Sequence, residues 1–385
     1  MKNQLPVVAH INHSFFAKSE TFIYNYISNL KRYHPICLTW ELANLEQFPF
    51  PKGDLYSISL RIFALKWLLE RDTRRYFSRH SFAKSVIKER DAKLIHAHFG
   101  PESVYALRLK RSLRIPLITT FYGYDISKLA QRKRWMSRYK ILFEEGDLFL
   151  VEGSHMKSML VDLKCPEEKI QIQRISIPLN RILFRPRKPK KKGESVVLLF
   201  SGRFEEKKGL LYALKAVEEA KERSNNIEFR LIGDGSLKPK IEEFIKTHRM
   251  GDYVQILGFL NYDDYLKEML KADIFIHPSI TASDGNSEGG APTTILEAQA
   301  TGLPVISTYH ADIPNVVVPG KSALLSREKD YKATSEHIEY LLKNQDAWEQ
   351  MGHVGRDFVE AHHNVKKEVD VLEQKYDFLM KKTFL

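Results

Sequence analysis

Short apolar runs bounded by turn-forming residues alternate along the chain with longer stretches whose apolar positions follow helical spacing. This alternation is typical of βα units around mostly parallel sheets, so the predicted fold class is α/β. The expected strands are Val7–Ile11, Ile36–Thr39, Leu94–His98, Leu117–Phe121, Leu148–Glu152, Ile170–Ile175, Val196–Ser201, Glu228–Ile232, Val254–Leu257, Ile274–His277 and Pro304–Ser307. The expected helices include Thr21–Arg32, Glu102–Arg111, Lys208–Ser224, Leu237–His248, Tyr262–Ala272 and Thr294–Thr301.

A basic segment that contains two prolines separates the two series of elements, at residues 185–193. Its prolines and mutually repelling charges cannot join a core, which predicts a linker between a domain at 1–184 and a second domain at 194–364. A nuclear-localisation or nucleic-acid patch is the alternative interpretation of this segment. Residues 365–385 are expected to form a C-terminal helix that packs back on the first domain, because their apolar positions follow helical spacing. These apolar residues are Val369, Leu372, Tyr376 and Leu379.

Composition narrows the class of protein. The chain has 385 residues, of which 43% are hydrophobic and 28% charged, and this excludes a collagen, a disordered tail or a small disulfide scaffold. Two cysteines, Cys37 and Cys165, cannot form a disulfide framework, which favours a reducing compartment. The N-terminus lacks the apolar core of a secretory signal, and no window approaches the ~20 apolar residues of a membrane span. We therefore expect a cytoplasmic protein.

The net charge of +12 is unevenly distributed. Residues 1–192 hold 36 Lys and Arg against 17 Asp and Glu, whereas the remainder holds 24 against 31. This asymmetry indicates that the first half meets an anionic partner such as a membrane surface, nucleic acid or an acidic polymer. Residues 61–90 and 131–140 mix basic with aromatic side chains, which suits a helix in a membrane interface. A core-facing helix with a solvated basic side is the alternative.

The first motif that suggests chemistry follows the opening strand of the second half. Gly202 lets the backbone approach a ligand, Arg203 offers a planar guanidinium, and Lys208 lies where the next helix begins. Because the N-terminal amides of a helix favour anions, these residues predict a clamp for a diphosphate. Charges in an exposed loop are the alternative.

The second motif is a Gly-rich loop that opens a helix. Its free amides can hold phosphate oxygens, while Glu297, one turn inside the helix, can accept hydrogen bonds from vicinal hydroxyls such as those of a ribose. Glu288, before the glycines, is placed to bind the hydroxyls of a second sugar. Complementation of the helix dipole is the alternative for a lone glutamate in a first turn. The other residues expected to bind the donor here are Gly289, Gly290, Thr293 and Thr294.

The segments SGRFEEKKG, IGDGSL, LGFL, ADIFIHPS and EGGAPTTILEAQATGLPVIS follow one another in this order. They resemble the donor-binding domain of retaining glycosyltransferases with the two-Rossmann GT-B architecture, and more narrowly those of family four. In the first half, Ser19–Ile23, Ile95–Gly100 and Thr120–Asp125 are similar to the branch that builds bacterial exopolysaccharide and colanic-acid-type repeat units. The resemblance covers nearly the whole chain.

This resemblance implies two Rossmann-like domains that face each other across a cleft, the first binding the acceptor and the second the nucleotide sugar. It implies that Arg203 and Lys208 hold the donor diphosphate, that Glu297 grips the ribose, and that Glu288 contacts the transferred sugar. It further implies retention of anomeric configuration. The substrate is expected to be a nucleotide-diphosphate sugar of the UDP or GDP type, with no separate cofactor.

The sequence departs from the family pattern at two places. Eight residues separate Glu288 from Glu297, where the family usually has seven. The usual His-Gly-x-Asp of the first domain reads Tyr122-Gly-Tyr-Asp125, and Tyr122 can donate a hydrogen bond but cannot become cationic near neutral pH.

Four residues of the first half are expected on the acceptor side of the cleft: Glu20, His98, Tyr122 and Asp125. His98 either lines the cleft or is a structural histidine. Glu20 either contacts donor phosphate or acceptor, or caps the helix that begins beside it. No two aspartates are separated by one residue, so the Asp-x-Asp motif that holds a divalent ion in the other large glycosyltransferase fold is absent, and we expect no metal. The cationic clamp would then stabilise the charge on the leaving diphosphate.

Together with this resemblance, the sequence predicts a retaining, metal-independent hexosyltransferase. It would act on a growing glycan or a polyprenyl-linked acceptor in exopolysaccharide or lipopolysaccharide biosynthesis, peripherally bound to the anionic inner face of the plasma membrane, with no nucleic acid as partner. One alternative is a nucleotide-sugar epimerase of the same fold. The other is a non-catalytic basic protein that binds anionic lipid or nucleic acid.

Overall fold

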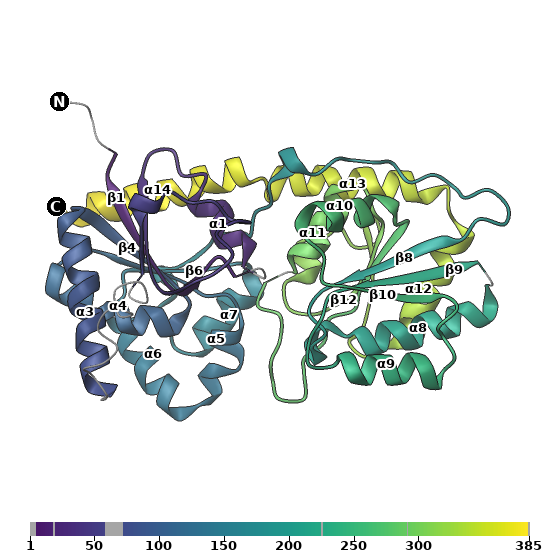
Figure 1. Cartoon of the computed structure of the whole chain (residues 1–385), viewed down its shortest axis with the longest axis horizontal. Coiled ribbons are helices and arrows are strands. Elements are labelled where there is room, and N and C mark those ends of the chain that lie inside the picture. Colours follow the sequence, from purple (N-terminus) through teal and green to yellow (C-terminus); the bar gives the residue numbers. More distant parts are fainter. Residues whose placement is uncertain (1–4, 18–19, 58–71, 225, 291, 384–385) are drawn as a thin grey trace. The chain divides into compact units, whose positions relative to one another are not determined.

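The computed structural model describes residues 5–17, 20–57, 72–224, 226–290 and 292–383. The chain divides into two compact units (Figure 1). Unit 1 comprises residues 1–176 together with 365–385, and unit 2 comprises residues 177–364. Each unit contains one sheet with helices packed against it, so the predicted α/β class is confirmed.

The described part of unit 1 contains a seven-stranded sheet in which every neighbouring pair is parallel. The chain starts in the middle of the sheet, adds strands toward one edge and then returns to the other, which is the doubly wound arrangement. From edge to edge the strands are β3 (Leu55–Ser57), β2 (His34–Leu42), β1 (Val7–Phe15), β4 (Ala92–His98), β5 (Leu117–Thr120), β6 (Leu148–Val151) and β7 (Ile170–Ile172).

Unit 2 repeats this arrangement with a sheet of six described strands, all parallel. The central strands are almost entirely buried, as expected for a parallel sheet covered on both faces. From edge to edge the strands are β10 (Val254–Gly258), β9 (Ile227–Ile232), β8 (Val196–Ser201), β11 (Ile274–His277), β12 (Val305–Thr308) and β13 (Ala323–Ser326).

Helices accompany the strands in both units, and most of them connect one strand to the next. In unit 1 they are α1 (Thr21–Ile27), α3 (Asp72–Glu89), α4 (Gly100–Leu113), α5 (Tyr124–Ser127), α6 (Lys133–Glu145), α7 (Ser154–Asp162) and α14 (Val365–Thr383). In unit 2 they are α8 (Leu210–Arg223), α9 (Lys238–Thr247), α10 (Tyr262–Lys271), α11 (Thr293–Ala300), α12 (Tyr331–Lys343) and α13 (Ala347–His362).

The helix α14 follows unit 2 in the chain but packs on the sheet of unit 1. Its apolar face joins a buried cluster with residues of β1, β4, β5 and β6. The hydroxyl of Tyr376 lies 2.7 Å from Nδ1 of His96 on β4. Glu373, whose side chain is buried, accepts hydrogen bonds from the backbone amides of Lys31 and Arg32 at 2.7 and 2.6 Å. These contacts make α14 part of the core of unit 1.

The structure differs from the expected linker at 185–193. The boundaries lie instead at 176/177 and 364/365, and the basic segment belongs to unit 2. Arg187 is fully buried, and its guanidinium donates to backbone carbonyls, including that of Ala272 at 3.0 Å and that of Met269 at 2.6 Å. A guanidinium carries five donors, and carbonyl acceptors around it allow its burial despite the charge.

The structure describes the two basic and aromatic stretches, residues 61–90 and 131–140, to different extents. Residues 61–71 lie outside the described part of the chain, and α3 contains most of the rest of the first stretch. The second stretch forms α6, which buries Tyr139, Leu142 and Phe143 in the core of unit 1. Its cationic residues Lys133, Arg134 and Lys140 are exposed. Within the described residues, none of the helices combines the length and apolarity that crossing a membrane requires.

Candidate active site

The predicted donor residues lie at the carboxyl edge of the sheet of unit 2. The order in which the chain adds strands reverses between β8 and β11, because β9 lies on one side of β8 and β11 on the other. In open parallel sheets such a switch point opens a crevice that binds ligands. Gly202 and Arg203 follow β8, and Ser279 lies two residues beyond β11. The loop after β12 brings His310 to the same edge.

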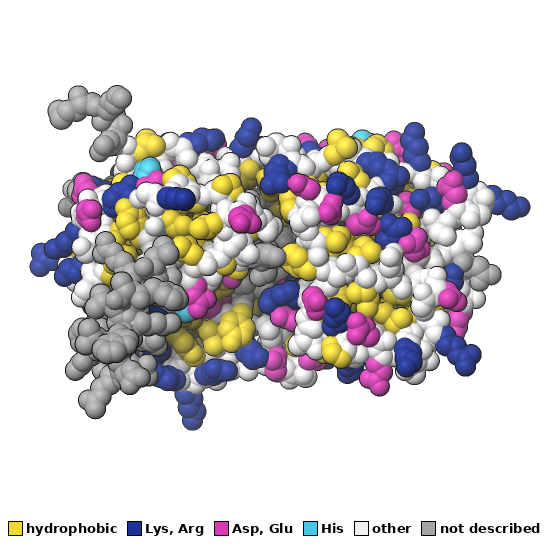
Figure 2. All heavy atoms as spheres, in the orientation of Figure 1, with side chains coloured by type: hydrophobic (Ala, Val, Ile, Leu, Met, Phe, Trp, Pro, Cys, Tyr) yellow, Lys and Arg dark blue, Asp and Glu magenta, His cyan; other side chains and the backbone are white. Residues whose placement is uncertain are grey.

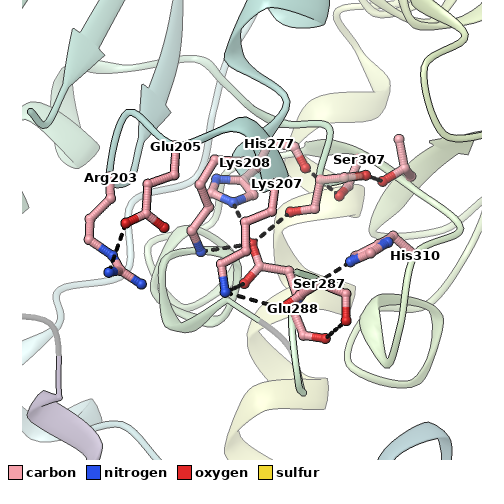
Figure 3. Close-up of polar contacts among 11 residues, drawn as sticks. Arg203, Glu205, Lys207, Lys208, His277, Ser287, Glu288, Ser307 and His310 are labelled. Atoms are coloured by element: carbon pink, nitrogen blue, oxygen red, sulfur yellow. Dashed lines mark hydrogen bonds and ion pairs between the residues drawn. The ribbon is translucent and has the colours of Figure 1, made fainter. Parts of the chain in front are cut away.

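Glu288 and Lys208 form a buried ion pair in this region, with 2.8 Å between Oε1 and Nζ (Figure 3). Oε1 also accepts a hydrogen bond from the hydroxyl of Ser279 at 3.1 Å. Burial alone would raise the pKa of Glu288, but the ammonium groups of Lys208 and Lys207 together hold it well below the usual range. The carboxylate is therefore ionised, and it lies against the cation that was expected to hold phosphate.

Lys207 is a second cation at this site, and the sequence reasoning missed it. Its side chain is almost completely buried, and Nζ donates to the carbonyl of Ser287 at 3.1 Å while lying 3.9 Å from Oε2 of Glu288. Burial lowers the pKa of Lys207, and the nearby carboxylate opposes that effect. The signal for it in the sequence is the pair of lysines before Gly209, of which only Lys208 was predicted as a site residue.

Gly202 and Arg203 differ in how they take part. A Cβ at Gly202 would lie 3.2 Å from Cε1 of His277, so the absence of a side chain allows β8 and β11 to end close together. Arg203 is half exposed, and its guanidinium lies 2.9 Å from Oε1 of Glu205. Figure 3 shows the ammonium groups of Lys207 and Lys208 directed at Glu288, with Arg203 to one side.

His310 holds the loop that carries Glu288. The backbone amide of Glu288 donates to Nε2 of His310 at 3.1 Å. Nε2 must therefore be unprotonated, so the ring proton of the neutral form lies on Nδ1, which is 2.6 Å from Oε1 of Glu328. The amide, the imidazole and the carboxylate of Glu328 form a continuous chain that fixes the position of Glu288 without touching its side chain.

Glu297 lies within α11, at its buried face, and its carboxylate has two tyrosine partners. The hydroxyl of Tyr262 donates to Oε1 at 3.1 Å, and that of Tyr265 donates to Oε2 at 2.7 Å. Burial raises the pKa of Glu297 to about 7, although both hydroxyls oppose the shift. Sequence reasoning missed these tyrosines, because an apolar or aromatic residue at helical spacing indicates only packing.

The remaining donor residues surround the start of α11. Gly289 and Gly290 are buried in bends that precede it, and Pro292 occupies the N-cap position. The Oγ1 atom of Thr294 is buried and has no hydrogen-bond partner among the described residues. The first amides of a helix also lack partners within it, so this terminus presents several donors that an anion can satisfy. Thr293 is half-buried beside it.

In unit 1 each of the four expected acceptor-side residues contacts neighbouring residues. His98 is buried, and its Nδ1 lies 2.7 Å from the hydroxyl of Tyr122. The ring of Tyr122 packs against Phe22 at the start of α1, 4.8 Å between centroids. Glu20 occupies the N-cap position of α1, but its carboxylate accepts from Nδ2 of Asn12 at 3.3 Å and does not bond a helix amide. Of the two roles expected for His98, its burial and hydrogen bond correspond to that of a structural histidine.

Asp125, the fourth of these residues, is fully buried. Its carboxylate accepts hydrogen bonds from three backbone amides, those of Gly100, Tyr122 and Gly123, at 3.0 to 3.1 Å. Burial raises its pKa to about 6, and these amides oppose the shift. Asp125 thus ties the loop that carries Tyr122 to the start of α4.

Three buried histidines, His10, His96 and His98, lie close enough for their nitrogens to suggest a metal site. Their rings are partly stacked: His96 and His98 are inclined by 24° with centroids 4.5 Å apart, and His10 and His98 by 16°. The third pair, His10 and His96, is tilted by 40°. Nδ1 of His10 lies 3.1 Å from Nε2 of His98, and burial lowers the pKa of His10 to about 3. The group is a neutral hydrogen-bonded cluster.

Both halves of the chain match known protein families. The family described as Glycosyl transferases group 1 matches residues 183–358, and Glycosyltransferase Family 4 matches residues 36–179. The putative colanic acid biosynthesis glycosyltransferase WcaL of Escherichia coli K12 is 33% identical over 249 residues, which are 64% of this chain and 61% of WcaL. The amylovoran biosynthesis glycosyltransferase AmsK of Erwinia amylovora is 31% identical over 244 residues, 63% of this chain and 59% of AmsK. The matches thus span less than two thirds of both relatives.

Solved structures resemble the fold. The crystal structure of Anabaena HepE in complex with UDP and glucose has a TM-score of 0.76 at 13% identity, and the match covers 96% of this chain and 99% of HepE. Both units have the parallel α/β architecture of GT-B glycosyltransferases, the class to which this fold belongs. The chain belongs to the group 1 glycosyltransferases, with a family-four N-terminal half, as its motifs indicated.

Proposed function

We propose that this protein is a retaining glycosyltransferase that moves a hexose from a nucleotide-diphosphate sugar to a growing, lipid-linked glycan in surface polysaccharide biosynthesis. Its relatives WcaL and AmsK carry names from exopolysaccharide biosynthesis, which supports the pathway class. The proposed donor is a UDP or GDP sugar. UDP is the first probe, because HepE, which shares the fold, was crystallised with UDP and glucose.

The observation that carries this proposal is the buried pair of Lys208 and Glu288 at the switch point of unit 2. A free ammonium carries three donors, so Lys208 can keep its bond to Glu288 and still bind a phosphate oxygen. With Lys207 beside it, the site holds two cations against one carboxylate and keeps a net positive charge for a diphosphate. Such fixed charge stabilises the leaving group as it develops, so we assign this role to Lys208, with Arg203 at the exposed side.

Glu288 and Glu297 take the sugar groups in this proposal. Glu288 is fixed through its backbone by His310 and through its side chain by Lys208, so its second oxygen is held ready for a hydroxyl of the transferred sugar. Glu297, one helical turn inside α11, would accept hydrogen bonds from the ribose. The amides that begin α11, near Thr294, would bind phosphate oxygens. No step of this scheme requires a metal ion.

The acceptor side is assigned to unit 1, where Glu20 and Tyr122 lie near the carboxyl edge of the sheet. Tyr122 stands where the family usually has histidine, and His98 behind it orients its hydroxyl. We assign the exposed cations of α6 to contact with the anionic inner face of the plasma membrane, where each cation contributes about 1 kcal/mol. Figure 2 shows many Lys and Arg side chains exposed on the face in view.

A stepwise experiment tests the proposal. UDP and GDP are first screened for an increase in melting temperature, which a saturating ligand must produce. Release of nucleotide diphosphate from a bound nucleotide sugar is then measured with and without glycan acceptor, because release that depends on acceptor separates transfer from epimerisation. Membrane vesicles with and without anionic lipid test the assignment of α6.

Glu297→Ala is the variant that tests the site. We expect weaker donor binding and near-complete loss of transfer, whereas the matched control Glu243→Ala, at an exposed position of α9, should retain both. Near-normal transfer by Glu297→Ala would overturn the site assignment. Absence of any melting shift with both nucleotides would overturn the proposed function.

A further inference from the structure

Two tyrosines hydrogen-bond the carboxylate of Glu297 and do not merely pack against it. Tyr262 and Tyr265 are three residues apart on α10, so they share one face of that helix. Each hydroxyl donates to a different oxygen of the same carboxylate, at 3.1 and 2.7 Å. The outer ring is itself held, because the guanidinium of Arg181 lies 4.9 Å above Tyr262 and pairs with Asp263 at 3.1 Å.

One donor on each oxygen fixes the plane of the carboxylate. An ionised carboxylate has two acceptor positions on each oxygen, four in all. The hydrogen bonds found among the described residues occupy one position on each, and the second position of each oxygen remains for a ligand. Two acceptor positions on one rigid carboxylate match two hydroxyls on adjacent carbons. A carboxylate free to rotate would present the same atoms with a larger loss of entropy on binding.

We propose that Tyr265, supported by Tyr262, is a positioning residue that orients Glu297 toward both vicinal hydroxyls of a ribose and so sets the preference for a ribonucleotide over a 2′-deoxyribonucleotide. This inference rests on the proposed function, because it takes Glu297 to be the residue that meets the nucleoside. Tyr265 would touch the carboxylate and not the ligand.

The electrostatics of the site are consistent with this role. Burial raises the pKa of Glu297, and the two tyrosine hydroxyls are the groups that lower it. Arg181 and Asp263 act on Tyr262. Two other charged or titratable groups on neighbouring elements have partners other than Glu297. Arg356 of α13, the helix that packs on α11, donates to the carbonyl of Ala300, and His277 of β11 lies near Glu288. Loss of a tyrosine donor therefore raises the pKa of Glu297, so that more of the carboxyl is protonated and accepts fewer hydrogen bonds at neutral pH.

Calorimetric titration of UDP and 2′-deoxy-UDP, and of GDP and 2′-deoxy-GDP, tests the inference on the intact protein. We expect the wild type to bind the ribonucleotide about ten-fold more tightly than its deoxy analogue, the effect of one hydrogen bond to a charged acceptor. In Tyr265→Phe this ratio should fall to about two, and the loss of affinity on acidification should move to higher pH. Tyr262→Phe, at a half-buried position, should show a smaller change in the same direction.

Tyr340→Phe is the matched control, because Tyr340 is exposed on α12. It should keep the wild-type ratio, and its pH profile corrects for titration of the ligand phosphate. If Tyr265→Phe and Tyr262→Phe both bind the ribonucleotide and keep the wild-type ratio, the inference is wrong while the proposed function stands. If the wild type binds none of the four nucleotides, the proposed function and the inference both fail.

Discussion

Replacing Lys208 by methionine is expected to lower the free energy of unfolding and to abolish transfer. A second variant can separate these two effects. The ammonium lies 2.8 Å from Oε1 of Glu288, and both side chains are largely buried, at 13% and 8% exposure. Removing it leaves a buried carboxylate that keeps Lys207 at 3.9 Å and the hydroxyl of Ser279 at 3.1 Å. Loss of one partner from a buried ion pair costs about 3–5 kcal/mol, and the remaining contacts place this case near the lower end, at about 3 kcal/mol.

The second variant in this experiment is Lys208→Met combined with Glu288→Gln. A neutral amide no longer needs the cation of Lys208, so the double variant should unfold with a larger free energy than Lys208→Met alone. The return is partial, because Lys207 then loses its nearest carboxylate. Transfer should be lost in both variants, because both lack the ammonium of Lys208 that the proposal places on the diphosphate. Urea unfolding followed by circular dichroism measures the first quantity, and acceptor-dependent nucleotide release measures the second.

Two results would refute this reasoning. One is a Lys208→Met protein whose free energy of unfolding lies within about 1 kcal/mol of the wild type, since the pair would then contribute little. The other is a double variant that is no more stable than the single one. Recovery of transfer along with stability would instead show that Lys208 acts on Glu288 and not on the diphosphate.

The other predictions concern pH and metal. Because the folded state holds the pKa of Glu297 at about 7 against 4.5 when exposed, it binds the proton more tightly than the unfolded state, so this group lowers stability as pH rises from about 4.5 to 7, by about 3 kcal/mol. Glu297→Gln should therefore gain stability over the wild type on going from pH 4.5 to pH 8 in thermal melts; a constant difference would contradict this. EDTA should leave transfer largely intact, since the sequence has no Asp-x-Asp motif and the cations of unit 2 serve the diphosphate; a strict requirement for Mg²⁺ or Mn²⁺ would count against it.

The sequence predicted the central strands and two of the four edge strands, β7 and β10, and missed the other two. The bounds of β8 and β11 agree with the prediction, because each is a short apolar run buried on both faces. The strands β3 and β13 were missed. They have three and four residues and lie at the edges of the sheets, where a strand needs few apolar positions. The edge strand β7 is as short as β3 but was predicted, so length alone did not decide which strands could be recognised.

The candidate site shows the same division between local and distant information. The motifs predicted Lys208 and Glu288 as separate ligand contacts, and the pairing between them joins residues 80 positions apart, which no local pattern reports. The burial of Arg187 was missed for a similar reason, because a run of cations does not reveal the carbonyls of Ala272 and Met269 that surround it. Tyr265 was assigned only to a helix, since its partner Glu297 lies on another one.

The passage of the chain into unit 2 and back has a consequence for synthesis on the ribosome. Unit 2 is a continuous stretch, whereas unit 1 needs α14, which is translated only after unit 2 is complete. Until α14 emerges, Leu94, Ile118 and Leu150 lack the apolar face of that helix, against which they pack in the folded protein. The second unit can thus mature first, and the nascent first unit would be a natural client for a chaperone that binds exposed apolar surface.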